Sequence, residues 1–239
     1  MLNIQHLTKV YGGKKAVDDL SLHIRPGEIY GFIGHNGAGK TTTLKSCCGI
    51  LQFDGGDILV DGVSIRTDPM DCKRRLAYIP DNPDLYEYMT GIQYLHFIAD
   101  VFGVPAAERA ERIRRYGDAF ELTGDLAQPV SAYSHGMKQK LAILSALVHA
   151  PRLLLMDEPF VGLDPKASHQ LKVLMRQFCD GGGAIFFSTH VLEVAEKLCD
   201  KVAIIRGGRL VRAGAMDEVR GDDSLEEVFL ELEGEKDDA

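Results

Sequence analysis

Apolar residues recur along the chain at two spacings, one typical of strands and one typical of helices. Towards both ends, short apolar runs separated by turn pairs such as Gly12-Gly13 and Pro26-Gly27 predict β-strands. The predicted strands span residues 2–10, 20–24, 29–33, 58–60, 76–79, 153–156, 185–187 and 202–205. The run at 153–156 has no polar position, which indicates a strand covered on both faces.

Between the strand regions, the apolar residues return at helical spacing. A first helix is predicted over residues 41–51, and a longer helical section extends from residue 83 to about residue 149. The amphipathic stretches of this section lie at residues 95–102, 106–120 and 137–148. Strand patterns then resume, so we expect an α/β core with an inserted helical section and no second domain in tandem.

The order of elements sets the expected organisation of residues 1–239 as a single domain. The core is expected to comprise residues 1–82 and 150–220, with residues 83–149 as the helical subdomain. Residues 221–239 are expected to add a C-terminal helix and an acidic tail.

The predicted C-terminal helix begins at a capping box, in which Ser224 precedes Glu227 by three residues. Its apolar stripe consists of Leu225, Val228, Phe229 and Leu232. We expect this stripe to pack on the protein's own core, and the alternative is that it binds a partner.

Composition and charge exclude several classes of protein. The chain has 239 residues, of which 45% are hydrophobic and 26% charged, which excludes a disordered or fibrous protein. The net charge of -8 belongs to residues 221–239, which hold nine acids and one base, so acids and bases balance in the remaining 220 residues. The one basic patch, at residues 109–115, is interpreted as a solvated helix face. We therefore expect no nucleic-acid partner.

Five cysteines, an odd number without a C-x-x-C pair, are expected to be reduced thiols in the cytosol. They are Cys47, Cys48, Cys72, Cys179 and Cys199. The first residues lack the pattern of a secretory signal, and the most apolar stretch, 141–156, contains polar residues and a proline. This stretch is too short and too interrupted to cross a membrane, so a partner would have to supply any span.

The strand at 29–33 leads into a glycine-rich loop and then into a helix, which is the context of a phosphate-binding loop. The candidate nucleotide-binding residues are Gly34, His35, Asn36, Gly37, Ala38, Gly39, Lys40, Thr41 and Thr42. The glycines allow backbone amides to surround the β- and γ-phosphates of a nucleoside triphosphate. Lys40 is expected to contact phosphate oxygens, and the Thr41 hydroxyl to bind Mg²⁺.

Two adjacent carboxylates, Asp157 and Glu158, follow the buried strand at 153–156. Ligands of open α/β sheets bind at this edge of the sheet. We expect Asp157 to hold Mg²⁺ through water and Glu158 to orient or deprotonate the attacking water. Together with the phosphate loop, the pair predicts ATP hydrolysis.

A third motif lies between these two, at residues 133–141. Ser134 and Gly136 stand at the start of a long helical pattern, where a hydroxyl and free amides can bind phosphate or can simply cap the helix. In this order the motif resembles the L-S-G-G-Q signature of ATP-binding cassette (ABC) proteins. Its Y-S-x-G-M-x-Q form is similar to that of ATPase subunits of exporter-type ABC transporters.

Further motifs carry the same resemblance over nearly the whole chain. Tyr11 stands where the family has an aromatic ring that stacks on adenine, and Val17 would pack beside it. Asp164, in Gly-Leu-Asp-Pro, resembles the D-loop aspartate, and His190, after Ser-Thr, resembles the switch histidine that contacts the γ-phosphate. The fold implied is a RecA-like P-loop NTPase core with Walker A and Walker B motifs, an antiparallel β subdomain and an inserted α-helical subdomain.

One position departs from the family. Asp81 replaces the glutamine whose loop links the metal and the attacking water to the membrane partner. We expect Asp81 to reach Mg²⁺ through a water molecule. The alternative is that it caps the turn made by Asn82 and Pro83.

The resemblance implies an ATPase with ATP and Mg²⁺ as cofactors. Its partners would be a membrane-spanning transporter subunit and a second ABC subunit, identical or paralogous, at the cytoplasmic face of the cell membrane. Each site of the dimer would combine the phosphate loop of one subunit with Ser134 and Gly136 of the other. The alternatives are a soluble ABC ATPase of the iron-sulfur assembly type, and a cassette used in DNA repair or translation.

Overall fold

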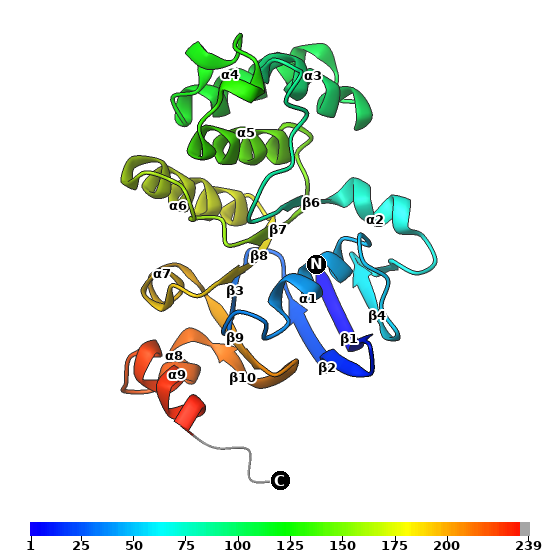
Figure 1. Cartoon of the computed structure of the whole chain (residues 1–239), viewed down its shortest axis with the longest axis vertical. Helices are drawn as coiled ribbons and strands as arrows, with labels where there is room; N and C mark the ends of the chain where they lie inside the picture. The colour runs from blue at the N-terminus through cyan, green and yellow to red at the C-terminus, as the bar shows by residue number, and fades with distance from the viewer. Residues whose placement is uncertain (235–239) are drawn as a thin grey trace.

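The computed structural model describes residues 1–234, so the end of the expected acidic tail, residues 235–239, lies outside the described residues (Figure 1). A six-stranded sheet forms the centre, with one antiparallel strand, β10, at its edge. Its strands are, in order, β10 (Arg209–Ala215), β9 (Lys201–Arg206), β3 (Ile29–Ile33), β8 (Ala184–Thr189), β7 (Leu153–Asp157) and β6 (Leu76–Ile79). Every residue of β3, β7 and β8 is buried, because other elements cover both faces.

A second sheet is antiparallel and four-stranded, in the order β2-β1-β4-β5. Its strands are β1 (Leu2–Tyr11), β2 (Lys14–Ile24), β4 (Gly55–Val60) and β5 (Val63–Ser64). β1 and β2 join through Gly12 and Gly13, whose φ angles of 53° and 84° suit the tight turn of a hairpin. This is the antiparallel β portion predicted from the sequence.

The inserted helices leave the central sheet after β6 and return to it at β7, which is the neighbouring strand. They are α3 (Gly91–Val101), α4 (Ala106–Ala119) and α5 (His135–Val148), with short 3₁₀ turns at Thr123–Asp125 and Val130–Ala132. Figure 1 shows them stacked together at the end of the molecule opposite α8 and α9. Side chains cap the N-termini of α3 and α5, with a capping box at Thr90 and Gln93 and a serine cap at Ser134.

The remaining helices surround the two sheets. They are α1 (Lys40–Cys47), α2 (Pro69–Arg75), α6 (Pro165–Asp180), α7 (Leu192–Leu198), α8 (Met216–Arg220) and α9 (Leu225–Gly234). Alternate residues of the central strands enter two apolar clusters, one on each side of the sheet. Ile29 and Ile33 pack in the cluster of α5, α6 and α9, whereas Tyr30 and Phe32 pack in that of α1 and the antiparallel sheet.

Some elements differ from the prediction. Strands β5 and β10 and helix α2 were not predicted, because they are short or carry exposed polar side chains such as Arg209 and Arg212. Helix α1 ends at Cys47, four residues earlier than predicted, since Gly49 follows with φ 64°. The capping box of α9 is present, and Leu225, Val228 and Phe229 are buried as predicted.

All five cysteines are buried and free of disulfides. Within residues 1–234, no helix has the length and apolar character needed to cross a bilayer.

Candidate functional site

A cleft of about 200 Å³ lies at the carboxyl ends of β3, β6 and β7. Its lining residues are Ala16, His35, Asn36, Gly37, Gly39, Lys40, Thr41, Thr42, Asp81, Asp157 and Glu158. The predicted phosphate loop, both predicted strand-end acids and Asp81 therefore meet in one cleft.

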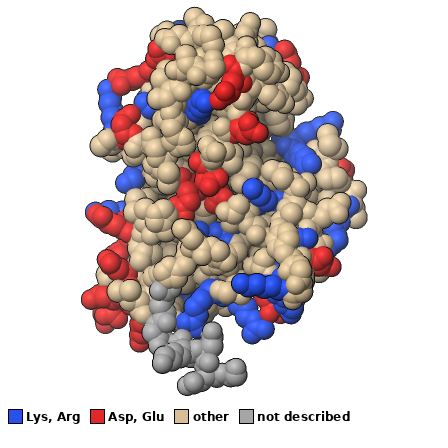
Figure 2. Space-filling view, in the orientation of Figure 1, with Lys and Arg blue, Asp and Glu red and all other residues tan. Residues whose placement is uncertain are grey.

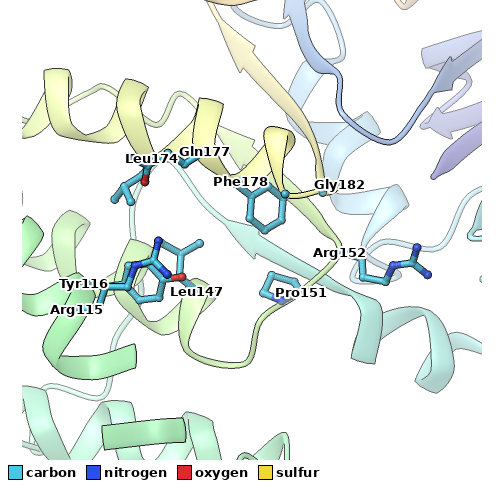
Figure 3. Close-up of a pocket in the computed structure, with 11 residues that line it drawn as sticks. Arg115, Tyr116, Leu147, Pro151, Arg152, Leu174, Gln177, Phe178 and Gly182 are labelled. Atoms are coloured by element: carbon cyan, nitrogen blue, oxygen red, sulfur yellow. The ribbon is translucent and has the colours of Figure 1, made fainter. Parts of the chain in front are cut away.

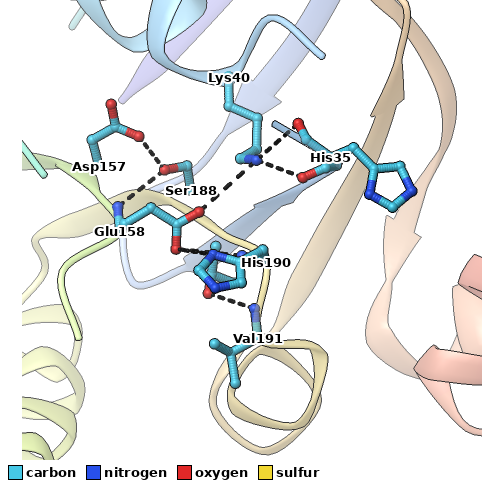
Figure 4. Close-up of polar contacts among 9 residues, drawn as sticks. His35, Lys40, Asp157, Glu158, Ser188, His190 and Val191 are labelled. Atoms are coloured by element: carbon cyan, nitrogen blue, oxygen red, sulfur yellow. Dashed lines mark hydrogen bonds and ion pairs between the residues drawn. The ribbon is translucent and has the colours of Figure 1, made fainter. Parts of the chain in front are cut away.

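The loop at the start of α1 is folded around the Lys40 ammonium. Lys40 Nζ donates hydrogen bonds to the carbonyl oxygens of Gly34 (2.5 Å) and His35 (3.2 Å), as Figure 4 shows. Burial lowers the pKa of Lys40, and the neighbouring Glu158 and Asp157 carboxylates partly oppose that shift. Gly39 has φ 113°, a backbone conformation that only glycine adopts without strain. The Lys40 ammonium thus holds the loop together and can bind an anion in the cleft.

The two strand-end acids are held by the adjacent strand. The register pairs Asp157 with Ser188, and the Ser188 hydroxyl donates a hydrogen bond to Asp157 Oδ1. The same hydroxyl accepts a hydrogen bond from the Glu158 backbone N–H at 3.1 Å. Glu158 has φ 47°, a left-handed backbone conformation at the point where the chain leaves the strand. Ser188 therefore fixes both acids relative to β8.

His190 contacts the same glutamate. Its Nδ1 lies 3.0 Å from Glu158 Oε2, and Lys40 Nζ lies 3.9 Å from the other oxygen, Oε1 (Figure 4). The predicted catalytic residues thus lie together, with Lys40 at the start of α1, Glu158 directly after β7 and His190 directly after β8.

The charge and hydrogen-bonding capacity of the cleft fit a magnesium ion with phosphate. Asp157 Oδ2 and Glu158 Oε1 are buried without a hydrogen-bond partner in the described part of the chain. Buried carboxylate oxygens of this kind require a cation or water. No group of three His, Cys, Asp or Glu side chains in residues 1–234 forms a complete metal site. Mg²⁺ suits such a cleft, because it binds one or two protein oxygens and takes the rest from water and phosphate.

Asp81 forms a contact of the turn-capping kind considered from the sequence. It lines the cleft, and its Oδ1 accepts a hydrogen bond from the Asn82 N–H at 2.9 Å. The turn-capping contact is therefore formed, with the carboxylate still at the cleft.

The predicted adenine contacts lie outside this cleft lining. Tyr11 ends β1 at the hairpin and is 49% exposed, with Lys9 Nζ 5.0 Å from its ring centre. Val17 is fully buried beneath the phosphate loop, where a Cβ atom on Gly39 would lie 3.5 Å from it.

Ser134, Gly136 and Asp164 form a second group, and none of them lines the cleft. Ser134 caps α5, accepting a hydrogen bond from the Met137 N–H at 3.2 Å, and Asp164 caps α6. A Cβ atom on Gly136 would lie 2.8 Å from the Gly162 carbonyl oxygen, so the start of α5 packs tightly on the loop before α6. Lys140 bridges the same two helices through Asp164 at 3.1 Å.

Ser188 is the functional residue that sequence reasoning missed. The motif Ser-Thr-His drew attention only to His190. A polar residue at the end of an otherwise apolar buried strand was the available signal.

A larger hollow, of about 460 Å³, lies elsewhere, between α6 and the inserted helices (Figure 3). Leu174 and Phe178 on α6 face Tyr116 and Leu147 across it. Its lining contains no acid, Ser, Thr or Cys, and no chemistry is assigned to it.

Comparisons with known proteins identify the family of this chain. The profile of the family described as "ABC transporter" matches residues 17–161. An uncharacterized ABC transporter ATP-binding protein of a Nostoc species is 38% identical over 84% of this chain, which spans 60% of that relative's length. The ABC-type transporter ATP-binding protein EcsA of Bacillus subtilis is 33% identical over 97% of this chain and 96% of its own length. A solved ATP-binding subunit of an ABC transporter superposes with a TM-score of 0.94, at 35% identity, over 98% of this chain and 99% of that chain.

Proposed function

This chain belongs to the ABC transporter family as an ATP-binding protein, and we propose from its site how it binds ATP and hydrolyses it to power transport. Its fold is the RecA-like P-loop core with an antiparallel β subdomain and inserted helices. We propose that residues 1–239 form one nucleotide-binding domain, with residues 83–149 as its helical subdomain. The transporter names of its relatives support transport over a role in the assembly of a complex.

The observation that supports hydrolysis best is the placement of Glu158 between Lys40 and His190. His190 engages Oε2 at 3.0 Å, so Oε1 remains available to accept a proton from water. Lys40 and the loop amides bind the β- and γ-phosphates and offset the charge that develops on them.

Asp157 and Thr41 would hold Mg²⁺, which supplies positive charge between the phosphates when it is bound. In the proposal Asp157 acts through a water molecule, and the Thr41 hydroxyl binds directly. Tyr11 is proposed to stack on the adenine ring, with Val17 supporting the loop beneath it.

The second group of residues supports a dimer with composite sites. Ser134 and Gly136 start a 14-residue helix, and neither lines the cleft of their own subunit. We propose that they contact the γ-phosphate held by a second ABC subunit, where the end of the helix favours negative charge. Asp164 lies in the loop that packs on Gly136, so it would meet the same interface.

A membrane-spanning partner is supported by exposed aromatic side chains on α3 and on the segment that leads into it. Tyr86 and Tyr88 stack with ring centres 5.8 Å apart, and Phe97 packs against Tyr86 at 5.5 Å. Tyr88 is 80% exposed, an exposure that a large aromatic side chain rarely keeps without a partner. Figure 2 shows mostly uncharged surface over this end of the molecule.

We propose that a cytoplasmic helix of the membrane subunit docks on this patch, which places the chain at the cytoplasmic face of the cell membrane. The signature form of residues 133–139 supports an exporter. If this is correct, replacing Tyr88 and Phe97 by Ser abolishes copurification of the membrane subunit while leaving ATP binding in place. Retained copurification would exclude the patch.

The substitution Glu158→Gln tests the hydrolytic assignment. The amide keeps the shape of the side chain but cannot accept a proton, so turnover should fall by about 10² to 10⁴ while MgATP binding persists. Glu193→Gln is the matched control, because it changes an exposed glutamate paired with Lys197. Near wild-type hydrolysis by the Glu158 variant would exclude Glu158 as the base.

Mixing two inactive variants tests the composite site. A Lys40→Ala subunit and a Ser134→Ala subunit each lack activity as homodimers, but their mixed dimer contains one intact site. Partial recovery of ATPase activity on mixing is expected. No recovery, in samples where mixed dimers are demonstrated by mass, would argue for a site within one subunit.

A further inference from the structure

The C-terminal helix α9 lies against the phosphate loop, and the hydrolysis described above makes no use of it. The Phe229 ring meets the His35 ring edge to face, with centres 5.1 Å apart. Phe229 is 9% exposed and belongs to the buried stripe of α9. A residue near the end of the chain thus contacts a residue of the nucleotide-binding loop.

His35 contributes to the cleft through its backbone. Its carbonyl oxygen accepts a hydrogen bond from Lys40, whereas its ring is directed away from Lys40 and from the acids (Figure 4). The two sides of His35 therefore face different partners, its carbonyl oxygen the Lys40 ammonium and its ring Phe229, outside the cleft.

A second contact route joins α9 to the other end of the same loop. Arg206, at the end of β9, donates a hydrogen bond to the carbonyl oxygen of Leu232 in α9. The turn that follows Arg206 donates from the Gly208 N–H to the Ala38 carbonyl oxygen at 2.9 Å. His35 thus contacts α9 directly. Ala38 is hydrogen-bonded to the turn after β9, the strand whose Arg206 contacts α9.

The start of α9 is fixed to α7, the helix that follows His190. Glu196 of α7 accepts a hydrogen bond from the Leu225 N–H at 3.1 Å and forms an ion pair with Arg220 at 3.3 Å. Helix α9 therefore contacts both α7, which follows His190, and the phosphate loop.

We propose that Phe229 is a positioning residue for nucleotide binding, which acts through His35 to hold the phosphate loop in its binding conformation. The inference rests on the proposed function. A loop that is already ordered loses less conformational freedom when it closes on phosphates, so its affinity for ATP is higher. Loss of the Phe229 ring should weaken ATP binding without altering the groups that carry out hydrolysis.

The test compares Phe229→Leu, which keeps apolar volume but removes the ring, with Leu230→Ala, a control at a 59% exposed neighbour. The measurements are the Kd of MgATP, KM, kcat and the thermal midpoint of unfolding. Phe229→Leu should raise Kd and KM about two- to twelvefold, as expected for one aromatic contact, with kcat changed less than twofold. Phe229→Tyr keeps an aromatic edge and should bind ATP as the wild type does.

His35 provides an independent test at an exposed position, where substitutions do not threaten folding. His35→Ala should raise the Kd of MgATP as Phe229→Leu does, whereas His35→Phe should retain the affinity for MgATP. The double variant His35→Ala/Phe229→Leu should bind MgATP no more weakly than either single variant. Wild-type affinity in both Phe229→Leu and His35→Ala, or additive losses in the double variant, would overturn the inference. Failure of the wild-type protein to bind ATP would instead refute the proposed function.

Discussion

The substitution Ser188→Ala tests how the two strand-end acids are held. Ser188 is fully buried, and its hydroxyl provides the only hydrogen bond to the Asp157 carboxylate within residues 1–234. Asp157 is itself 1% exposed, and its second oxygen has no partner in that part of the chain. Alanine would leave a buried carboxylate with no hydrogen bond, whereas the Glu158 N–H would keep its bond to the Ser188 carbonyl oxygen.

The expected cost follows from the charge of the acceptor. A hydrogen bond to a charged group stabilises a protein by about 1.5–3 kcal/mol. In a chain of this size each kcal/mol lowers Tm by about 2–4 °C, so Tm should fall by about 3–12 °C in the absence of nucleotide. Removal of the hydroxyl also frees the Asp157 side chain to rotate, so the Mg²⁺ concentration needed for half-maximal hydrolysis should rise.

The control is Ser46→Ala, since Ser46 is equally buried but donates to a neutral backbone carbonyl, that of Thr42, at 2.8 Å. Its loss should cost about 1 kcal/mol or less. The assay is urea or thermal unfolding of both variants, each also made in an Asp157→Asn background. There the cost of Ser188→Ala should drop to that of a neutral hydrogen bond. Equal costs for the two serines, or an unchanged cost in the Asn background, would refute the reasoning.

Three further predictions concern Asp81 in the cleft, Gly34 in the phosphate loop and His149 at the end of α5. Asp81→Asn keeps the turn-capping oxygen but removes the negative charge, so ATP hydrolysis should require a higher Mg²⁺ concentration while Tm stays unchanged. An unaltered Mg²⁺ dependence would leave Asp81 only the turn-capping role. Gly34→Ala brings a Cβ atom to 2.5 Å from the Ile205 carbonyl oxygen, so it should abolish ATP binding in equilibrium titrations. Tight ATP binding by this variant would contradict the close approach of Gly34 to Ile205. Burial lowers the pKa of His149 below 6.5, so the folded state resists its protonation and loses stability as pH falls below that value. His149→Gln should therefore lose less stability between pH 7 and pH 5 in urea unfolding, and equal losses would exclude His149 as the cause.

The parts of the site that follow from the sequence are those encoded over a few residues. A strand, a glycine-rich loop and a helix come together at Lys40 because each is specified locally, and the acids at 157 and 158 simply continue their strand. The roles of these residues in catalysis stay predictions. Strand β10 could not be predicted, because its exposed polar residues break the apolar pattern of a strand and are tolerated only at the edge of the sheet, where β10 pairs with β9 alone.

Contacts between segments that lie far apart in the chain could not be predicted from the sequence. Ser188 meets Asp157 through the register of β7 and β8, about 30 residues apart, and that register is fixed by packing of the whole sheet. The contact between Phe229 and His35 is of the same kind. The capping box at Ser224 predicted the helix, but not the surface on which the helix lies.

The position of β3 in the central sheet has a consequence for biosynthesis. The strand that leads into the phosphate loop is flanked on both sides by strands made much later, with Ile29 paired to Ile185 and Tyr30 paired to Lys201. While a ribosome elongates the chain, β1, β2 and β4 can pair with one another, but both edges of β3 stay unsatisfied until β8 and β9 emerge. An apolar strand exposed at both edges is prone to associate with other chains. Nascent chains are therefore expected to need protection by chaperones until residue 206 has emerged, and fragments that stop short of β9 are expected to aggregate rather than fold.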